Sequence, residues 1–134
     1  MRPLLAVALL AALAPAAPVP KALKKADSEL LVGRWVPTGT SRSFFEFHAD
    51  GTMRCWTEGN EKNAPAYTWV TNSEATPKRM TWSMNGKPKW EAVYELDGDS
   101  LKFLYAHHPA KLPSAVKPDP EGNFEQLTRD TSAK

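Results

Sequence analysis

The paired histidines His107 and His108 are the residues whose types most directly suggest chemistry, because imidazole is both a common metal ligand and a general base. Adjacent residues of an extended chain point in opposite directions, however, so the two rings are poorly placed to bind one ion. A catalytic zinc ion also needs three converging protein ligands, and the sequence identifies no third one. The sequence therefore predicts no metal site.

The acidic residues suggest two further kinds of site, a carboxylate pair and a calcium loop. Glu91 and Glu95 share one face of a predicted strand, but four residues of strand span about 13 Å, too far for a paired-carboxylate hydrolase. The Asp97-Gly98-Asp99 run lacks the further oxygen ligands of a calcium loop, and a tight turn already explains it. The sequence also has no Ser-centred elbow, Gly-rich phosphate loop or HExxH helix. We assign no catalytic residue and no cofactor, and a hydrolase is only the third hypothesis.

Cys55 is the single cysteine, which excludes an intramolecular disulfide and a zinc site made of several thiolates. In the register that we predict for its hairpin, the side chain points inward. We expect a small buried hydrophobic side chain rather than a nucleophile, because no flanking residue would lower the pKa of the thiol.

The net charge argues against a nucleic-acid partner. The formal charge is +2, but Arg2, Lys21, Lys24 and Lys25 supply four of the 17 basic residues. Residues 27–134 therefore carry 13 basic and 15 acidic side chains, a balance of −2. A domain of this charge has little attraction for a phosphate backbone. The length of 134 residues fits one hydrophobic core.

The first residues have the parts of a secretory signal peptide, namely Arg2 in a positive start, an apolar run of ten residues at 4–13, and small residues at 14–16. As a membrane anchor the run is too short, because ten helical residues rise about 15 Å, half of a ~30 Å hydrocarbon core. We predict a signal peptide at 1–16 and a disordered basic leader at 17–26. The mature protein would then be secreted or periplasmic, without a transmembrane segment.

Residues 90–105 predict a β-hairpin, because two stretches of alternating side chains flank the turn-forming pair Asp97-Gly98. A two-residue loop at this pair places the apolar side chains on one face. The predicted cross-strand pairs are Tyr94 with Leu101, Ala92 with Phe103 and Trp90 with Tyr105.

Two other hairpins are predicted upstream. A three-residue loop at 49–51, with Gly51 in the left-handed conformation, separates apolar pairs from a charged one. Its predicted pairs are Phe47 with Met53, Glu46 with Arg54 and Phe45 with Cys55. A five-residue loop at 85–89 would join the strand at 78–84 to the strand that begins at residue 90. Its predicted pairs are Met84 with Trp90, Trp82 with Ala92 and Met80 with Tyr94.

The complete pattern is that of an all-β domain at 27–134, an antiparallel meander of about eight strands that forms a small barrel, closed or half-open. The predicted strands are 31–36, 43–48, 52–58, 66–70, 78–84, two within 90–105, and 123–129. A short helical turn at 27–31, capped by Asp27-Ser28, precedes them. The Pro-rich loop at 106–122 is the candidate for a lid.

A family resemblance supports this fold. The GRW run at 33–35 and Arg129 near the end of the last strand resemble the lipocalin pattern, in which a first-strand tryptophan packs near an arginine at the closed end. With the signal peptide, the runs at 76–80 (TPKRM) and 94–102 (YELDGDSLK) resemble small secreted lipocalin-like domains of planctomycete bacteria. The resemblance covers 30–129 and implies a lipocalin-like barrel and a secreted location, but no function and no catalytic residue.

Gly33, Trp35 and Arg129 are predicted to be structural, as are Asp97 and Gly98 of the turn. If the first and last strands meet, the guanidinium of Arg129 can lie on the indole of Trp35. Such a contact stabilises a fold by about 0.5 to 2 kcal/mol.

Large aromatic side chains carry the remaining functional signal. The predicted ligand-contacting residues are Trp69, Trp82, Trp90, Tyr94, Phe103 and Tyr105. An eight-stranded barrel is just wide enough to be filled by side chains or to hold one small ligand, so both alternatives stay open. We predict a non-enzymatic, monomeric binding module for a small apolar or aromatic ligand.

The alternative hypothesis is a cell-envelope domain with a filled core that binds a protein or glycan through its outer face. Phe44 and Trp56 are predicted to be paired there. An exposed apolar patch at this pair would favour the alternative.

Overall fold

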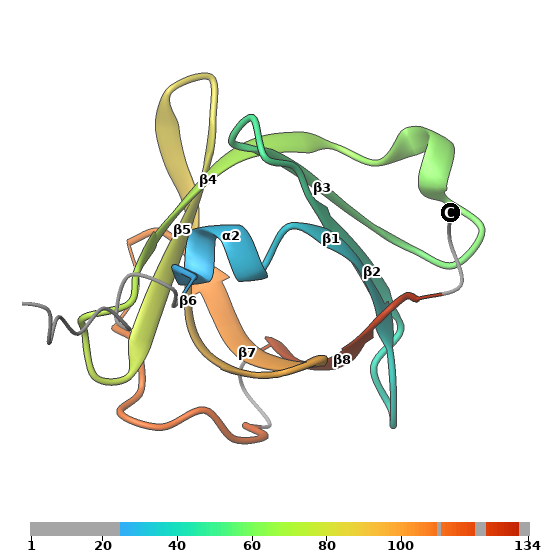
Figure 1. Ribbon diagram of the computed structural model, residues 1–134. Coiled ribbons are helices and arrows are strands. Elements are labelled where there is room, and N and C mark those ends of the chain that lie inside the picture. The colour runs from blue at the N-terminus through green and yellow to red at the C-terminus, as the bar shows by residue number, and fades with distance from the viewer. Residues whose placement is uncertain (1–24, 110, 120–122, 132–134) are drawn as a thin grey trace, which may run out of the picture.

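Eight antiparallel strands close into a barrel in the computed structural model, which describes residues 25–109, 111–119 and 123–131 (Figure 1). Each strand pairs with its neighbours in sequence, and the first strand also pairs with the last. The elements are α2 (Asp27–Leu30), β1 (Gly33–Pro37), β2 (Ser43–Phe47), β3 (Thr52–Thr57), η3 (Glu61–Asn63), β4 (Ala66–Asn72), β5 (Lys78–Met84), β6 (Lys87–Asp97), β7 (Ser100–His107) and β8 (Asn123–Arg129).

This architecture confirms the predicted all-β meander with a short helical turn before it, and of the two predicted barrels it is the closed one. The closing ladder between β1 and β8 runs from the Trp35–Arg129 pair to the Pro37–Leu127 pair. The predicted signal peptide at 1–16 lies outside the described residues, as does most of the predicted leader.

The β6–β7 hairpin forms, but its predicted register was wrong by two residues. Asp97 pairs with Ser100, so the two-residue loop is Gly98-Asp99 and not Asp97-Gly98. Gly98 has a φ of 60° and Asp99 has no positive φ, the pattern of a type II′ turn with glycine at its first central position. A slip of two residues leaves every side chain on its predicted face. The observed pairs are Tyr94 with Phe103, Ala92 with Tyr105 and Trp90 with His107.

The predicted five-residue loop between β5 and β6 was also wrong. The loop consists of Asn85 and Gly86, whose φ values of 54° and 79° fit a type I′ turn. A β-bulge between Trp82 and Ser83 then shifts the register by one residue, so that Trp82 faces Trp90. The bulge is needed because the two-residue loop alone would put these two tryptophans on opposite faces of the wall.

The predicted register of the β2–β3 hairpin is confirmed. The observed pairs include Phe47 with Met53, Glu46 with Arg54 and Phe45 with Cys55. Gly51 closes the loop with a φ of 92°. The Asp50 carboxylate accepts hydrogen bonds from the Thr52 hydroxyl at 2.6 Å and backbone N–H at 3.0 Å, which lower the pKa of Asp50.

α2 closes one end of the barrel, which we call the α2 end. In Figure 1 the helix lies across the middle of the ring of strands. Leu31, directly after the helix, is fully buried in the core cluster. The predicted capping by Asp27-Ser28 does not occur, because the N-cap is Ala26 and no side chain caps it. The Asp27 carboxylate instead accepts hydrogen bonds from Tyr94 and Lys78.

The loop after β7 does not form the predicted lid. Its residues 111–119 run along the outside of the wall (Figure 1), and residues 114–116 line a groove together with Tyr94–Leu96 of β6. The paired side chains of Val93 and Leu104 are buried, although neither belongs to the core cluster inside the barrel. The described part of the loop therefore lies beside the outer wall instead of across an opening.

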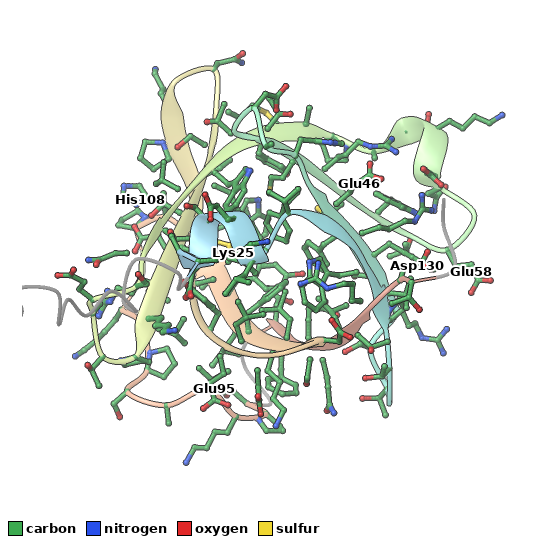
Figure 2. All side chains as sticks on the ribbon, in the orientation of Figure 1. Lys25, Glu46, Glu58, Glu95, His108 and Asp130 are labelled. Atoms are coloured by element: carbon green, nitrogen blue, oxygen red, sulfur yellow. The ribbon has the colours of Figure 1, made fainter. Side chains whose placement is uncertain are left out.

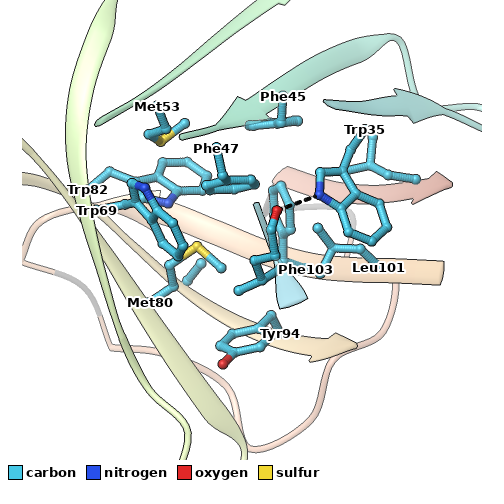
Figure 3. Packing of buried hydrophobic residues seen from close by; sticks show 13 residues of the cluster. Trp35, Phe45, Phe47, Met53, Trp69, Met80, Trp82, Tyr94, Leu101 and Phe103 are labelled. Carbon is cyan, nitrogen blue, oxygen red and sulfur yellow. Dashed lines mark hydrogen bonds between the residues drawn. The ribbon is translucent and has the colours of Figure 1, made fainter. Parts of the chain in front are cut away.

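The middle of the barrel is packed with aromatic rings (Figure 3). Phe45 meets Phe103 edge to face with ring centroids 4.8 Å apart, and Trp82 meets Phe103 at 5.5 Å. Edge-to-face pairs at these distances add to the stabilisation that comes from burial alone. The cluster comprises Leu31, Trp35, Phe45, Phe47, Met53, Trp69, Met80, Trp82, Ala92, Tyr94, Leu101, Phe103 and Leu127.

Candidate functional site

Polar groups at the α2 end are paired with one another. The Tyr94 hydroxyl donates a hydrogen bond to the Asp27 carboxylate at 2.7 Å, and the Lys78 ammonium lies 3.0 Å from the same carboxylate. Burial raises the pKa of Tyr94, and the hydrogen bond to Asp27 raises it further. The Trp35 indole N–H donates to the Leu31 carbonyl at 2.9 Å (Figure 3). These bonds fasten α2 to the barrel, so this end is structural.

Arg129 completes the α2 end, in the arrangement expected from the sequence. Its guanidinium carbon lies 4.4 Å from the centroid of the Trp35 ring. The guanidinium also donates hydrogen bonds to the carbonyl oxygens of Leu30 at 2.6 Å and Val32 at 3.0 Å. A further hydrogen bond goes to the Asp99 carboxylate at 2.9 Å. Gly33 has a φ of 136°, and a Cβ atom there would lie 3.0 Å from the guanidinium. Glycine at this position therefore leaves the room that Arg129 needs.

The opposite end of the barrel, which we call the Glu125 end, has a polar interior. Five side chains define it: Cys55, Tyr67, Trp90, Tyr105 and Glu125. The alternation of β8 explains how a carboxyl group comes to be inside, because Glu125 and Leu127 are buried while Gln126 between them is exposed.

Glu125 is the buried charged residue of the described chain, with 8% of its surface exposed. The Tyr105 hydroxyl donates a hydrogen bond to its Oε2 atom at 3.3 Å, whereas the buried Oε1 atom has no hydrogen-bond partner among the described residues. Burial raises the pKa of Glu125, and the hydroxyls of Ser41, Ser43 and Tyr105 oppose that rise. The carboxyl group is thus held in place but left incompletely satisfied.

The neighbours of Glu125 are hydrogen-bond donors and not nucleophiles. Burial raises the pKa of the Cys55 thiol to about 11, and the charge of Glu125 raises it further. Burial also raises the pKa of Tyr105, again with a contribution from Glu125. Both groups are therefore protonated at neutral pH. Cys55 is half-buried against the core, which agrees with its predicted role as a small hydrophobic side chain.

Trp90 connects the interior of the Glu125 end to its rim. Its indole N–H donates a hydrogen bond to the Tyr67 hydroxyl at 3.3 Å. On the exposed side it stacks on His107, with ring centroids 3.9 Å apart and an interplanar angle of 25°. A hollow of about 760 Å³ lies at the same end, where β1 and β3 finish, and is lined by Pro37, Ser41 and Thr57 among others.

The predicted ligand-contacting residues fall into two groups. In the first, the rings of Trp82, Trp90 and Phe103 each contact Tyr105, with centroids 5.2, 5.3 and 5.7 Å away. In the second, Trp69 packs on Phe47 at 4.9 Å, and Tyr94 is bound to Asp27 beneath α2. The structure thus brings four of the six side chains together and engages the other two elsewhere in the core.

The side chains considered for metal or acid chemistry do not converge. His107 stacks on Trp90, whereas His108 contacts the carboxylate of Glu91. Glu95 is exposed and lies well apart from His108 in Figure 2. Within the ranges that the structure describes, no three His, Cys, Asp or Glu side chains are grouped so that they could hold a metal ion.

Phe44 and Trp56 stack on the outer face as predicted, with centroids 5.6 Å apart. They do not form an exposed apolar patch, because Trp56 is only 7% exposed. The guanidinium carbons of Arg34 and Arg54 lie 5.0 and 4.8 Å from its ring centroid. Both arginines also bind Glu61 of η3, and these bonds lower the pKa of Glu61. This pair therefore does not provide the exposed apolar patch that would have favoured the envelope-binding alternative.

Sequence reasoning missed Glu125. The available signal was the NFEQLTR run at 123–129, in which Glu125 lies on the same face as Leu127 and Arg129. Because Arg129 was predicted to pack inside on Trp35, the same alternation places Glu125 inside too. A lone acid on the apolar face of a strand is a departure from binary patterning that calls for a partner.

The fold and this site define a closed antiparallel barrel that is capped by a helix at one end and holds a buried carboxyl group at the other. Comparisons with protein-family models, curated proteins and solved structures gave no match. Across the described residues, no helix has the length and apolar character needed to cross a membrane.

Proposed function

We propose that this protein is a secreted, lipocalin-like binding module that holds a small ligand with an aromatic or apolar group at the Glu125 end. The signal-like pattern at 1–16 supports secretion, and the GRW run at 33–35 with Arg129 supports the lipocalin-like relationship. The protein acts by binding and catalyses no reaction.

A contrast in burial along the interior carries this proposal. Trp82 and Phe103, in the middle of the barrel, are 1% and 0% exposed, whereas Trp90 and Tyr105 toward the Glu125 end are only partly buried. An aromatic ring that its own protein covers incompletely gains contact area when a ligand packs on it. A hollow of about 760 Å³ at the same end of the barrel, lined by residues of the β1–β2 loop and the end of β3, has the size of a small-molecule site.

The test is a titration of the purified protein with 2-phenylethanol, indole and decanoate, followed by tryptophan fluorescence and calorimetry. We expect a saturable response to at least one compound. Trp90→Phe should remove most of the fluorescence change, because Trp90 borders the site. Trp69→Phe makes the same substitution near the α2 end and should leave the change intact.

Two results would contradict the proposal. The first is the absence of saturable heat or fluorescence change for all three compounds at millimolar concentration. The second is an equal loss of signal in Trp69→Phe and Trp90→Phe, which would move the ligand away from the Glu125 end.

A further inference from the structure

We infer that Glu125 binds the ammonium group of the ligand, so that the protein selects small aromatic amines over neutral or anionic aromatic compounds. This inference rests on the proposed function and adds to it the charge of the ligand. It assigns a role to a carboxyl group that the fold itself does not use.

The unpartnered oxygen of Glu125 is the starting point. Oε1 is buried and has no hydrogen-bond partner among the described residues, while Oε2 accepts from the Tyr105 hydroxyl. A buried acceptor without a donor is costly, and native proteins rarely keep one unless a water, ion or ligand completes it. The atom therefore marks a place for a donor that comes from outside the chain.

The missing donor should be positively charged. The groups that act on the Glu125 carboxyl are the hydroxyls of Ser41, Ser43 and Tyr105, and no lysine, arginine or histidine of the described chain pairs with it. A buried carboxylate is normally matched by a cation. An ammonium group brings both the charge and several N–H donors, whereas a hydroxyl brings one donor and no charge.

The surroundings of Glu125 fit an amine with an aromatic body. Tyr105, which holds Oε2, is also in ring contact with Trp82 and Trp90. A cation near such rings is attracted to their faces, and a second ring can stack on the exposed one. The indole N–H of Trp82 is a second buried polar group without a hydrogen-bond partner in the described chain.

We place the entry of the ligand at the hollow of the same end. Ser41 lines that hollow, and its hydroxyl also acts on the Glu125 carboxyl. Its hydroxyl accepts a hydrogen bond from the Gln126 backbone N–H at 2.8 Å, which fixes it beside β8. An ammonium group that displaces the Ser41 side chain from the carboxyl would enter from solvent without a change in the barrel wall.

The experiment compares three compounds of nearly equal shape and different charge, namely 2-phenylethylamine, 2-phenylethanol and 3-phenylpropionate. Calorimetry at pH 8 with the purified protein should give the tightest binding for the amine, by about tenfold or more over the alcohol, the value of a hydrogen bond to a charged group. The carboxylate compound should bind most weakly, because it places a second negative charge beside Glu125.

Two variants locate the selectivity. Glu125→Gln keeps the shape of the side chain and should bind the amine and the alcohol equally. Glu95→Gln, the matched change at an exposed position on the outer wall, should keep the wild-type preference. Thermal unfolding of both variants checks that each is folded before the binding data are compared.

A pH series adds a second readout. The titratable groups that face Glu125 are Cys55 on β3 and Tyr105 on β7, with Tyr67 beyond them on β4. Cys55 and Tyr105 are not ionised near neutral pH, because burial raises the pKa of both. Because burial favours the protonated form of Glu125, the amine should bind more tightly as the pH rises from 5 to 8, and binding should release a proton. Glu125→Gln should abolish both effects.

The outcomes separate this inference from the proposed function. Equal binding of the three compounds, or an amine preference that survives Glu125→Gln, overturns the role of Glu125 but leaves a binding module. Failure of every compound to bind, including the neutral ones, overturns both.

Discussion

Asp27 and Glu125 are carboxyl groups of similar burial at opposite ends of the same barrel, with 12% of the Asp27 side chain and 8% of the Glu125 residue exposed. Asp27 is paired with both a hydroxyl and an ammonium group of its own chain. The Tyr105 hydroxyl donates a hydrogen bond to one oxygen of Glu125, and the other oxygen has no hydrogen-bond partner in the described chain. The carboxylate that holds α2 to the barrel thus has its hydrogen-bond partners within the chain. The unpartnered oxygen of Glu125 points instead to a partner from outside the chain.

The largest effect should come from breaking the α2 end. Trp35→Ala removes a fully buried ring that also holds the Leu31 carbonyl and the Arg129 guanidinium. We expect a loss of about 3 to 5 kcal/mol in the free energy of unfolding, measured in urea. Trp90→Ala, at the half-buried Glu125 end, should cost clearly less. Equal losses would mean that the two ends do not differ in structural importance.

Arg129→Ala should cost about 1 to 3 kcal/mol, because it removes the contact with Trp35 and leaves the carbonyls of Leu30 and Val32 without their donor. Arg129→Lys keeps the charge but loses the forked geometry of the guanidinium. Its free energy of unfolding should lie between those of the wild type and Arg129→Ala. Ligand binding should be unaffected in both variants, as judged by calorimetry. A melting temperature unchanged in Arg129→Ala would contradict the structural role.

Glu125→Gln should change the pH dependence of stability at the other end. The pKa of Glu125 is raised in the folded protein, so ionising it disfavours folding. This cost is absent below its ordinary pKa of 4.5, grows as the pH rises through the folded-state pKa, and is constant above it. The melting temperature of Glu125→Gln relative to the wild type should therefore increase from pH 4.5 to pH 8. A difference independent of pH would show that the carboxyl is not perturbed.

The smallest effect is expected on the outer wall. His108→Ala removes a contact with the Glu91 carboxylate in which the histidine side chain is 39% exposed, and such surface contacts contribute less than about 1 kcal/mol. Chemical denaturation of the variant checks this value. A larger loss would mean that this contact, rather than apolar packing, holds the loop after β7 to the barrel.

The strand pattern could be predicted from the sequence because alternation of side chains is a local property. The register of β2–β3 was also predictable, because Glu46 and Arg54 have opposite charges and so favour the pairing that faces them. The other two registers were missed where turn chemistry decides. Asn85-Gly86 forms a two-residue turn, and a β-bulge between Trp82 and Ser83 then shifts the strand register by one residue. No residue pattern near Trp82 indicates that bulge.

Neither the lid nor the site could be read from local patterns. The described part of the loop after β7 borders a groove beside Tyr94–Leu96 of β6, and no pattern within the loop itself indicates that position. Glu125 could have been placed inside by alternation, but its lack of a partner depends on which side chains of β2, β3 and β7 surround it. The spacing of residues along β8 does not reveal which side chains of the other strands surround Glu125.

The closing ladder between β1 and β8 has a consequence for protein engineering. The backbone N–H of Asp130 donates to the Arg34 carbonyl at 2.8 Å, so the chain enters and leaves the barrel at the same place. A short linker from the end of β8 to α2 would make the strand order circular, and the exposed Asn85-Gly86 turn could then be opened to provide new termini. In such a protein β1 would no longer be the first strand of the chain. A binding peptide or a label could then be attached at the Asn85-Gly86 turn, away from the junction of β1 and β8.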